Sequence, residues 1–276
     1  MSHNASDLPP LSVAIVVFNS SLPLLEQTLQ SLRVAAEKVV GSDVASLQVT
    51  IVDNGSSMEY QSGLEALRVE GLEYSLLRSL ENRGFGAGHN RGIARGQGGY
   101  HLVLNPDVDV APDALKAAIS LLSADPGTVL VSPYSQGSDG QQEFLCKRYP
   151  SVLVLALRAF LPVIGRRFFA TALQRYEMSD VCGADNNVHV PLASGCFMLM
   201  RKDQLVQVGG FDERYFLYFE DFDLSMRLGS LGALLYAPSV RIVHHGGYAA
   251  SKGWRHLRMF ASSGFRFFRQ HGWRWI

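Results

Sequence analysis

Apolar, β-branched runs recur along the first half of the chain, and segments of helical periodicity separate them. Residues 12–18, 47–52 and 129–133 are apolar at nearly every position, which is typical of strands buried on both faces. Residues 73–77 and 100–104 are shorter segments of the same kind. Strands that alternate with helices at this spacing predict βαβ units and a parallel sheet.

Two of the intervening segments carry clear helix signals. Residues 19–21 can cap a helix that begins near Pro23, and Pro112 with Asp113 opens another helix that runs to about Ser123. The loops that follow parallel strands collect at one edge of the sheet, where we expect a ligand to bind. The first helix has one apolar face, made of Leu24, Leu25, Thr28, Leu29 and Leu32.

The second half of the chain is less regular. Residues 135–150 form a polar excursion, and residues 151–175 are apolar and basic, interrupted by Pro162 and Gly165. The latter stretch predicts either a core helix pair or an element at a membrane surface. The remaining pattern predicts strands at residues 193–200, 234–236 and 241–243, a short helix at 202–208 and a helical segment from 251 onward.

Composition narrows the class of protein. The 276 residues are 47% hydrophobic, which excludes global disorder, and 25 basic residues balance 25 acidic ones, so nothing in the bulk charge favours nucleic acid. Three cysteines without a CxxC pair argue against a disulfide framework and fit a reducing, cytoplasmic setting. We expect neither a signal peptide at residues 1–10 nor a membrane span, because no long apolar run is present.

Residues 218–228 place three carboxylates, Glu220, Asp221 and Asp223, directly after a run of aromatic residues. Desolvation among aromatic rings raises the pKa of a carboxyl group and makes it a better base near neutral pH. Acidic residues are also favoured at a helix N-terminus by the helix dipole. The stretch alone leaves both interpretations open.

Two loops after buried strands carry candidate nucleotide-binding groups. Asp53 could accept from a ribose hydroxyl or a base N–H, or it could form an Asx-turn with its own backbone. Arg83 precedes a glycine-rich turn that contains Gly84, Gly86 and Gly88. The spacing matches neither a dinucleotide-binding fingerprint nor a P-loop, which leaves a flexible turn with one cation, suited to a nucleotide-sized anion.

Two further loops carry candidate metal ligands. Asp107 follows a buried strand, and its carboxylate suits Mg²⁺ or Mn²⁺; Asp109 offers a second oxygen. His244 and His245 follow a short strand and could bind a metal or a diphosphate, or simply form a turn. The chain has no zinc-site or serine-hydrolase motif.

Seven strings in order resemble the family-2 glycosyltransferases, especially their bacterial rhamnosyltransferase-like branch. The resemblance covers roughly residues 11–250, and the strings are VAIVVFNS, VTIVDNGSS, ENRGFGAGHNRGI, LVLNPDV, ASGCFMLMRK, VGGFDERYFLYFEDFDLSMRL and VHHGG. It implies an α/β GT-A fold, with a mainly parallel nucleotide-binding sheet flanked by helices, a mixed acceptor-side half and a C-terminal helix. We expect the domain at 9–250, with a nucleotide-sugar half at about 11–134, an acceptor half at about 135–250, and a helical extension at 251–276.

On the donor side, the resemblance implies that Asp53 contacts the nucleoside and that Arg83 with its glycines holds the diphosphate. Asp107 matches the last position of the family's D-x-D metal motif, whose first position is Asn105 here. His244 matches the C-terminal metal or diphosphate histidine, and Asp109 and His245 are the alternative metal ligands. The predicted nucleotide-binding residues are Asn19, Asp53, Arg83, Gly84, Gly86 and Asn105.

On the acceptor side, the resemblance implies that Asp221 is the catalytic base of an inverting transfer. We predict acceptor contacts from Gly195 and Glu220; Glu220 could bind acceptor hydroxyls or raise the pKa of the base by like charge. Asp223 is expected to cap or anchor the helix.

The predicted function is transfer of a sugar from a dTDP- or UDP-sugar, with dTDP-rhamnose as the first candidate, to a lipid-linked or lipopolysaccharide-type glycan. Mg²⁺ or Mn²⁺ is the expected cofactor. The alternative is a non-catalytic nucleotide-sugar or glycan-binding module of the same fold. A nucleotidyltransferase is disfavoured, because residues 19–23 lack its basic glycine-rich loop. The expected location is cytoplasmic, and the basic, aromatic residues 265–276 add the hypothesis of contact with the inner face of the plasma membrane.

Overall fold

The computed structural model describes residues 11–40, 47–246 and 253–276. Residues 1–10, where we expect no signal peptide, and the expected boundary at 250–251 lie outside the described residues. The strands of the described chain are β1 (Leu11–Val17), β2 (Leu47–Asp53), β3 (Tyr74–Arg78), β4 (Tyr100–Leu104), β5 (Val108–Val110), β6 (Thr128–Gly137), β7 (Gln142–Glu143), β8 (Val188–His189), β9 (Phe197–Arg201) and β10 (Ala233–His244).

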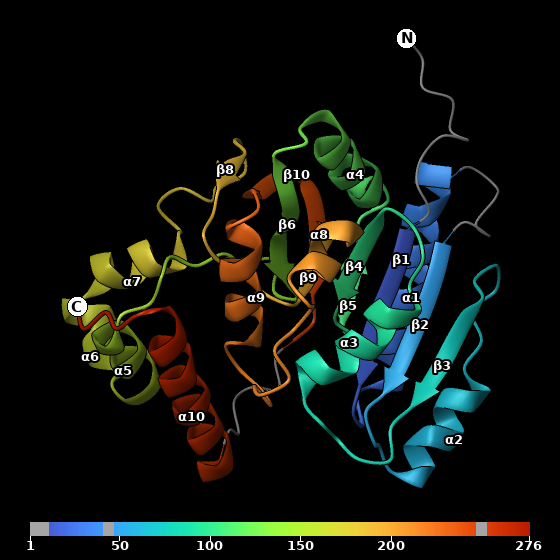
Figure 1. The fold of residues 1–276 in the computed structure, drawn as a ribbon, viewed down its shortest axis with the longest axis horizontal. Coiled ribbons are helices and arrows are strands. Elements are labelled where there is room, and N and C mark those ends of the chain that lie inside the picture. Colours follow the sequence, from blue (N-terminus) through green and yellow to red (C-terminus); the bar gives the residue numbers. More distant parts are fainter. Residues whose placement is uncertain (1–10, 41–46, 247–252) are drawn as a thin grey trace.

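Within the described residues these strands form one mixed sheet in the order β3-β2-β1-β4-β9-β6-β10-β5, with β7 on β6 and β8 on β10 (Figure 1). The first four strands in sequence are mutually parallel, as their buried apolar runs predict. Strand β9 lies antiparallel between β4 and β6, and β10 is parallel to β6 but antiparallel to β5. The prediction of an α/β fold with a mainly parallel sheet and a mixed second half is therefore confirmed.

The residues predicted as the last two strands are indeed strand, but their division into two was wrong. The expected short strands at 234–236 and 241–243 are parts of the single strand β10, whose register shifts between Ala237 and Arg241. This bulge accommodates Pro238, so the strand bends without ending. The sequence analysis also missed β5, whose three residues are too few to show a period of two, and which is a strand only because it pairs with β10.

The helices of the described chain cover both faces of the sheet, and several of them lie beyond one end of it (Figure 1). They are α1 (Leu22–Val40), α2 (Met58–Ala66), α3 (Phe85–Arg95), α4 (Ala114–Ala124), α5 (Val152–Phe160), α6 (Pro162–Phe168), α7 (Ala170–Glu177), α8 (Lys202–Gln207), α9 (Glu220–Gly229) and α10 (Trp254–His271).

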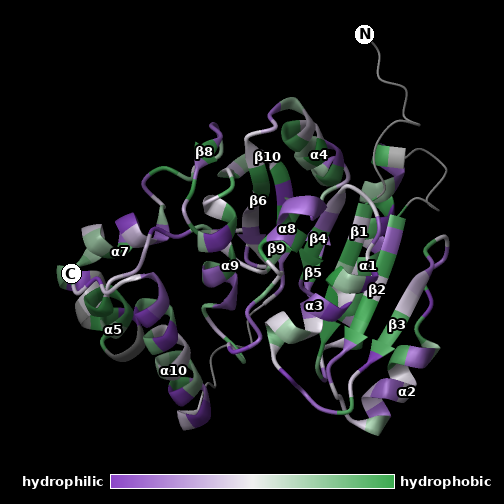
Figure 2. Cartoon of the chain, in the orientation of Figure 1, coloured by the Kyte–Doolittle hydropathy of each residue, from purple (hydrophilic) through white to green (hydrophobic). Residues whose placement is uncertain are grey.

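Strand β9 shows how the sheet separates two apolar cores. Phe197 and Leu199 face the core that contains the buried side chains of α1 and α4, whereas Met198 and Met200 face the core under α8 and α9. This alternation follows from the two-residue period of a strand, and both sets are apolar because both faces are covered. The apolar colouring of the central strands in Figure 2 has the same origin.

A third apolar cluster joins α5, α7, α9 and α10 at the end of the molecule opposite β3 and α2 (Figure 1). It contains Phe219 at the start of α9 and Phe267 of α10. The C-terminal tail completes it, because the carbonyls of Arg274 and Trp275 accept from the backbone N–H groups of Val152 and Leu153 at the start of α5.

Residues 151–175 therefore fold as short helices rather than as one helix pair, and part of this segment belongs to a core. No helix in residues 11–40, 47–246 and 253–276 combines the length and apolarity needed to cross a bilayer.

Candidate active site

The loops after β1 and β2 are held together by their own polar side chains. Asp53, fully buried, accepts the Ser56 N–H through Oδ1 at 3.0 Å. Asn19 donates its N–H to Ser56 Oγ at 2.9 Å, and its side-chain oxygen accepts from the Ser57 N–H. Asp53 Oδ2 is buried and has no hydrogen-bond partner among the described residues. The turn interpretation thus accounts for one oxygen of Asp53 and leaves the other for a ligand.

The glycine-rich turn lies against the segment before α9. Gly84 has φ +98°, and a Cβ there would lie 2.3 Å from the Phe216 carbonyl oxygen, so any larger residue is excluded by strain and by contact. Asn54, which the sequence analysis missed, donates to the Gly84 carbonyl at 2.9 Å. The sequence analysis explained this glycine by phosphate binding. Its close packing against Phe216 is enough to require glycine even without a phosphate.

Arg83 extends from this turn towards solvent. Its side chain is 63% exposed, and its guanidinium lies 3.7 Å from the Glu213 carboxylate. An exposed pair at this distance is weak, so Arg83 remains available to an anion.

Asp107 and His244 meet at the end of the sheet where β4 and β10 finish. His244 Nε2 lies 3.6 Å from Asp107 Oδ1, which is buried without a hydrogen-bond partner in the described part of the chain. His244 Nδ1 lies 2.8 Å from Glu143 Oε2, a residue that sequence reasoning missed. A carboxylate at Nδ1 holds the proton there and leaves the Nε2 lone pair for a ligand.

These groups fit a divalent cation. An orphaned carboxylate oxygen next to an oriented imidazole offers two protein ligands, and Mg²⁺ or Mn²⁺ in a phosphate site uses one or two and takes the rest from substrate and water. Among the described residues no three His, Cys, Asp or Glu side chains are grouped so that they could hold a metal ion by themselves.

The alternative ligands, Asp109 and His245, pair with each other instead. Asp109 Oδ2 lies 2.8 Å from His245 Nε2 and accepts from Gln27 Nε2 at 2.5 Å. Asp109 Oδ1, like Asp107 Oδ1, is buried without a hydrogen-bond partner in the described chain. The difference lies in the histidines: His245 Nε2 is held by Asp109 Oδ2, whereas His244 Nε2 has only the 3.6 Å contact with Asp107 and is more available to a ligand.

Asp221 is the second residue of α9 and is linked by hydrogen bonds to the strand end that carries Asn105. Asp221 Oδ2 accepts the Gly195 N–H at 3.0 Å, and the next residue, Cys196, accepts the Asn105 N–H through its carbonyl at 3.0 Å. Burial raises the pKa of the Cys196 thiol well above its usual value, and the charges of Asp107, Glu143 and Asp221 raise it further. All three carboxylates are therefore close enough to Cys196 to act on it electrostatically, which agrees with Asp221 and the Asp107–His244 pair belonging to one site.

Glu220 and Asp221 have different environments despite being neighbours. Burial raises the pKa of Asp221, against the lowering effect of N–H groups from Gly195 and Phe222. Burial raises the pKa of Glu220 much further, and the Asp221 charge adds to that shift; its Oε2 is buried without a partner in the described chain. The negative charge of Asp221 thus raises the pKa of Glu220, whereas the sequence analysis had offered the reverse, a rise in the pKa of Asp221 caused by Glu220. The larger rise for Glu220 means that Asp221 is the first of the two to lose its proton as pH increases.

Asp223 anchors a second helix. Its carboxylate is fully buried, forms a 2.6 Å ion pair with Arg227 on the same helix, and lies 2.7 and 2.8 Å from Gln270 and His271 of α10. The N-cap of α9 is Phe219, with φ +65°, and it makes no side-chain cap bond. Asp223 is therefore an anchor for α10 rather than a cap, and it also holds the wall of the cavity described next.

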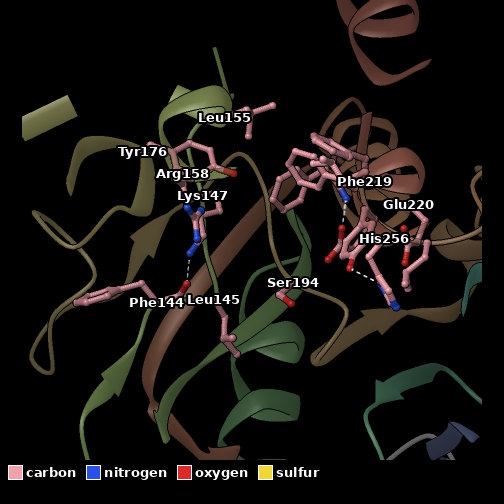
Figure 3. Close-up of a pocket in the computed structure, with 16 residues that line it drawn as sticks. Phe144, Leu145, Lys147, Leu155, Arg158, Tyr176, Ser194, Phe219, Glu220 and His256 are labelled. Carbon is pink, nitrogen blue, oxygen red and sulfur yellow. Dashed lines mark hydrogen bonds between the residues drawn. The ribbon is translucent and has the colours of Figure 1, made fainter. Parts of the chain in front are cut away.

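A cavity of about 570 Å³ opens beside Asp221. Aromatic and aliphatic side chains form most of its walls, and α10 contributes His256, Leu257 and Phe260. Figure 3 shows Lys147, Arg158 and Tyr176 grouped on one side, Phe219, Glu220 and His256 on the other, and Ser194 between them. Sequence reasoning missed Lys147 and Arg158, because nothing local marks a lysine or arginine that points into a cavity.

The sequence from residue 12 to residue 207 matches the model of Glycosyl transferase family 2. The chain belongs to glycosyltransferase family 2. The matched segment contains Asp53, Asp107 and Gly195 but ends before Asp221 and His244, so the roles of the latter two rest on their geometry and on the resemblance.

Curated relatives place this family-2 chain in the rhamnosyltransferase-like branch, as predicted. It is 31% identical over 252 residues to an N-acetylglucosaminyl-diphospho-decaprenol L-rhamnosyltransferase of Mycobacterium tuberculosis, across 86% of this chain and 77% of that protein. It is 25% identical over 183 residues to the rhamnosyltransferase WbbL of Escherichia coli, across 62% and 65% of the two chains. The prediction of a glycosyltransferase is thereby confirmed.

Solved structures agree on the GT-A fold of this family-2 chain. GalNAc-T7, solved with UDP, GalNAc and Mn²⁺, superposes with a TM-score of 0.66 at 15% identity over 93% of this chain, which spans about half (48%) of that protein. The mannosyltransferase PcManGT of Pyrobaculum calidifontis, solved with GDP-Man and Mn²⁺, superposes with a TM-score of 0.62 at 20% identity. The match covers 96% of this chain and 66% of the mannosyltransferase. At these identities the likeness concerns the fold.

Proposed function

We propose that this glycosyltransferase moves a sugar, with inversion, from a dTDP- or UDP-sugar to a lipid-linked glycan acceptor, with dTDP-rhamnose as the first donor to test. The observation that carries the proposal is the tie from Asp221 through Gly195 and Cys196 to Asn105, since it sets a desolvated carboxylate beside the strand ends expected to bind the donor. The names of the curated relatives support the choice of rhamnose and of a lipid-linked acceptor.

On the donor side, the free Oδ2 of Asp53 accepts from the nucleoside, next to Asn19 and Asn105. Arg83 contacts the diphosphate from the rim of the site. Asp107 and His244 would hold Mg²⁺ or Mn²⁺, which would neutralise the negative charge that develops on the leaving diphosphate. Residues 11–134 thus form most of the donor side in this proposal, and residues 135–250 most of the acceptor side.

On the acceptor side, Asp221 accepts the proton of the acceptor hydroxyl as the hydroxyl oxygen forms its bond to the anomeric carbon. The bond from that carbon to the nucleoside diphosphate breaks on the opposite face, so the configuration inverts. Protonated Glu220 donates a hydrogen bond to an acceptor oxygen and places no second negative charge beside the base.

A donor panel tests the function. Purified protein is incubated with dTDP-rhamnose, other dTDP-sugars and UDP-sugars, each with Mg²⁺ or Mn²⁺ and N-acetylglucosaminyl-diphospho-lipid as acceptor, and products are followed by mass spectrometry. We expect one donor to yield a glycosylated lipid and its nucleoside diphosphate, and EDTA to suppress the reaction. Binding of a nucleotide sugar without turnover on this acceptor would favour the non-catalytic alternative.

We also infer contact of this enzyme with an anionic membrane. The end of the molecule formed by α6 and the C-terminal tail exposes large apolar side chains, including Val163, Phe168, Trp275 and Ile276, each at least 65% exposed. Arginines lie between them in the sequence, and an apolar surface with basic residues suits anionic lipid.

Flotation with anionic liposomes tests this contact. Deleting residues 251–276 would remove the buried Phe267 and Phe268 and expose the apolar cluster that they complete, so substitutions are the better probe. Val163→Ser with Phe168→Ser should reduce the floated fraction. Met58→Ser with Leu80→Ser, which removes equally exposed apolar groups from the opposite end, should leave it unchanged. Equal flotation of both variants would contradict membrane contact at α6.

A further inference from the structure

The cavity beside Asp221 has walls of opposite charge. Glu220 lies on one side, and Lys147 and Arg158 lie on the other (Figure 3); Asp221, which follows Glu220 in the chain, also lines the cavity. A sugar hydroxyl needs only the acidic wall, where the proposed base lies. The Lys147 charge lowers the pKa of Asp221, but the proposed function uses neither cation as a binding group.

Lys147 forms no ion pair with any described residue. Its ammonium donates to the Phe144 carbonyl, and no carboxylate of the described chain lies within ion-pair distance of it. Burial, with the nearby Arg158 charge, lowers the pKa of Lys147 to about 8. A half-buried ammonium that has lost water and gained one neutral acceptor is stabilised by any anion that enters the cavity.

Arg158 adds a second positive charge to this wall. It lies over the Tyr176 ring, 5.2 Å from the ring centre, and 3.5 Å from the Glu177 carboxylate. The Arg158 and Glu177 side chains are 41% and 35% exposed, so solvent weakens this pair. With Lys147 included, the wall keeps an excess of positive charge.

The surface around the cations is apolar. Leu155 of α5 and Leu257 and Phe260 of α10 line the same cavity as the two cations. A free inorganic anion gains nothing from such walls, whereas an anion with a hydrocarbon chain buries that chain there.

We propose that Lys147 and Arg158 bind the phosphate or diphosphate that joins the acceptor sugar to its lipid, and that Leu155, Leu257 and Phe260 take the first part of the lipid chain. The sugar then lies between the two walls, with one hydroxyl at Asp221. This inference rests on the proposed function, because it names the acceptor class of the same site.

Kinetics with paired acceptors test the inference. The acceptors are N-acetylglucosaminyl-diphospho-lipid and a neutral alkyl N-acetylglucosaminide of equal chain length. Lys147→Met should lower the ratio of their kcat/KM values by about 10- to 100-fold, since a charge-assisted hydrogen bond is lost only with the diphosphate. Lys147→Arg should restore most of the ratio. An equal loss with both acceptors would mean that Lys147 acts through Asp221, and would overturn the proposal.

Lys202→Met is the matched control. Lys202 is also a half-buried lysine that donates to backbone carbonyls, those of Ile93 and Gly96, but it lies outside the cavity. Its removal should leave the acceptor ratio unchanged. Thermal melting of all variants shows whether a loss reflects unfolding.

A binding measurement separates this inference from the proposed function, because it needs no turnover. Calorimetry with farnesyl diphosphate, in saturating UDP and Mg²⁺, should give a Kd about 10- to 100-fold weaker for Lys147→Met than for the wild type or Lys202→Met. Inorganic pyrophosphate should bind more weakly than farnesyl diphosphate. Equal affinity for the two would point to a free anion, and equal Kd values for wild type and Lys147→Met would refute the site.

Discussion

The strand-end loops and the cavity beside Asp221 use carboxylates in opposite ways. Asp53 and Asp107 each keep a buried oxygen that no described residue hydrogen-bonds, and the loop around Asp53 is held by hydrogen bonds. Glu220 and Asp221 lie among aromatic rings, where burial raises the pKa of both. The first arrangement suits binding of donor groups and a cation, and the second suits uptake of a proton.

The comparison teaches that position in the fold, rather than residue type, sets the role of each acid in this protein. Asp223 makes the point most clearly, because it lies two residues from Asp221 on the same helix and serves only to hold α10. The variants described next test whether these acids have different roles.

The largest effect on stability is expected from Asp223→Ala. This change leaves the half-buried Arg227 without its partner and frees α10, so we expect the free energy of unfolding to fall by about 3–5 kcal/mol. Urea denaturation measures it. Asp212→Ala, which breaks the more exposed pair with Arg214, should cost about 1 kcal/mol or less. Similar costs for the two variants would show that Asp223 is not an anchor.

Asp107→Ala and Asp109→Ala compare the two acid–histidine pairs. Loss of Asp107 should lower kcat/KM by about 10²-fold and raise the Mg²⁺ or Mn²⁺ concentration needed for half-maximal rate, because it removes a proposed metal ligand. Asp109 is already paired with His245 and Gln27, so its loss should cost about tenfold or less. If Asp109→Ala has the larger effect, the metal site has been assigned to the wrong pair.

Gly84→Ala tests the packing of the glycine-rich turn. The new Cβ would meet the Phe216 carbonyl at a backbone angle that alanine rarely adopts, so we expect a loss of about 2–3 kcal/mol in stability. Gly140 also has a positive φ but no neighbour within 4 Å, and Gly140→Ala should cost only about 1 kcal/mol. Thermal or urea unfolding gives the difference, and equal costs would remove the contact with Phe216 from the explanation.

The smallest effect is expected from Glu220→Gln. The folded state raises the pKa of Glu220, so this residue favours folding below its ordinary pKa and loses that contribution as pH rises through the raised value. The variant should therefore be more stable than wild type at alkaline pH, by about 1 kcal/mol. Unfolding measured across pH tests this.

The acid limb of the rate profile checks the same assignment. Because Glu220 holds its proton while Asp221 titrates, Glu220→Gln should leave that limb where it is in the wild type. A shift of the limb to lower pH would mean that Glu220 is charged beside the base.

Much of the donor side could be predicted from the sequence, because its strands are local runs buried on both faces and its loops follow them directly. Asp53 could be identified from its position directly after a buried strand, without knowledge of any long-range contact. The meeting of Asp107 with His244 could be expected only from the resemblance, since β4, β5 and β10 bring together residues 137 positions apart. Glu143 has no local signal, because its role depends on the pairing of β7 with β6.

The cavity was beyond prediction for a physical reason. Its walls come from α5 and the segment before it, from α7, from the turn before β9, from the start of α9 and from α10, and only tertiary packing brings them together. Lys147 looks like an ordinary surface lysine until its burial is seen. Asp223 was expected to cap or anchor its helix, but its actual partners, Gln270 and His271, lie at the far end of α10.

The measurement that tests the central claim most directly is the comparison of Asp221→Asn with wild type in donor binding and in transfer. Asparagine keeps the shape of the side chain and an oxygen for the Gly195 N–H, but it cannot accept the acceptor proton. We predict that kcat falls by about 10²- to 10⁴-fold while the Kd for the nucleotide sugar is unchanged. Transfer at the wild-type rate by Asp221→Asn would contradict the assignment of the base.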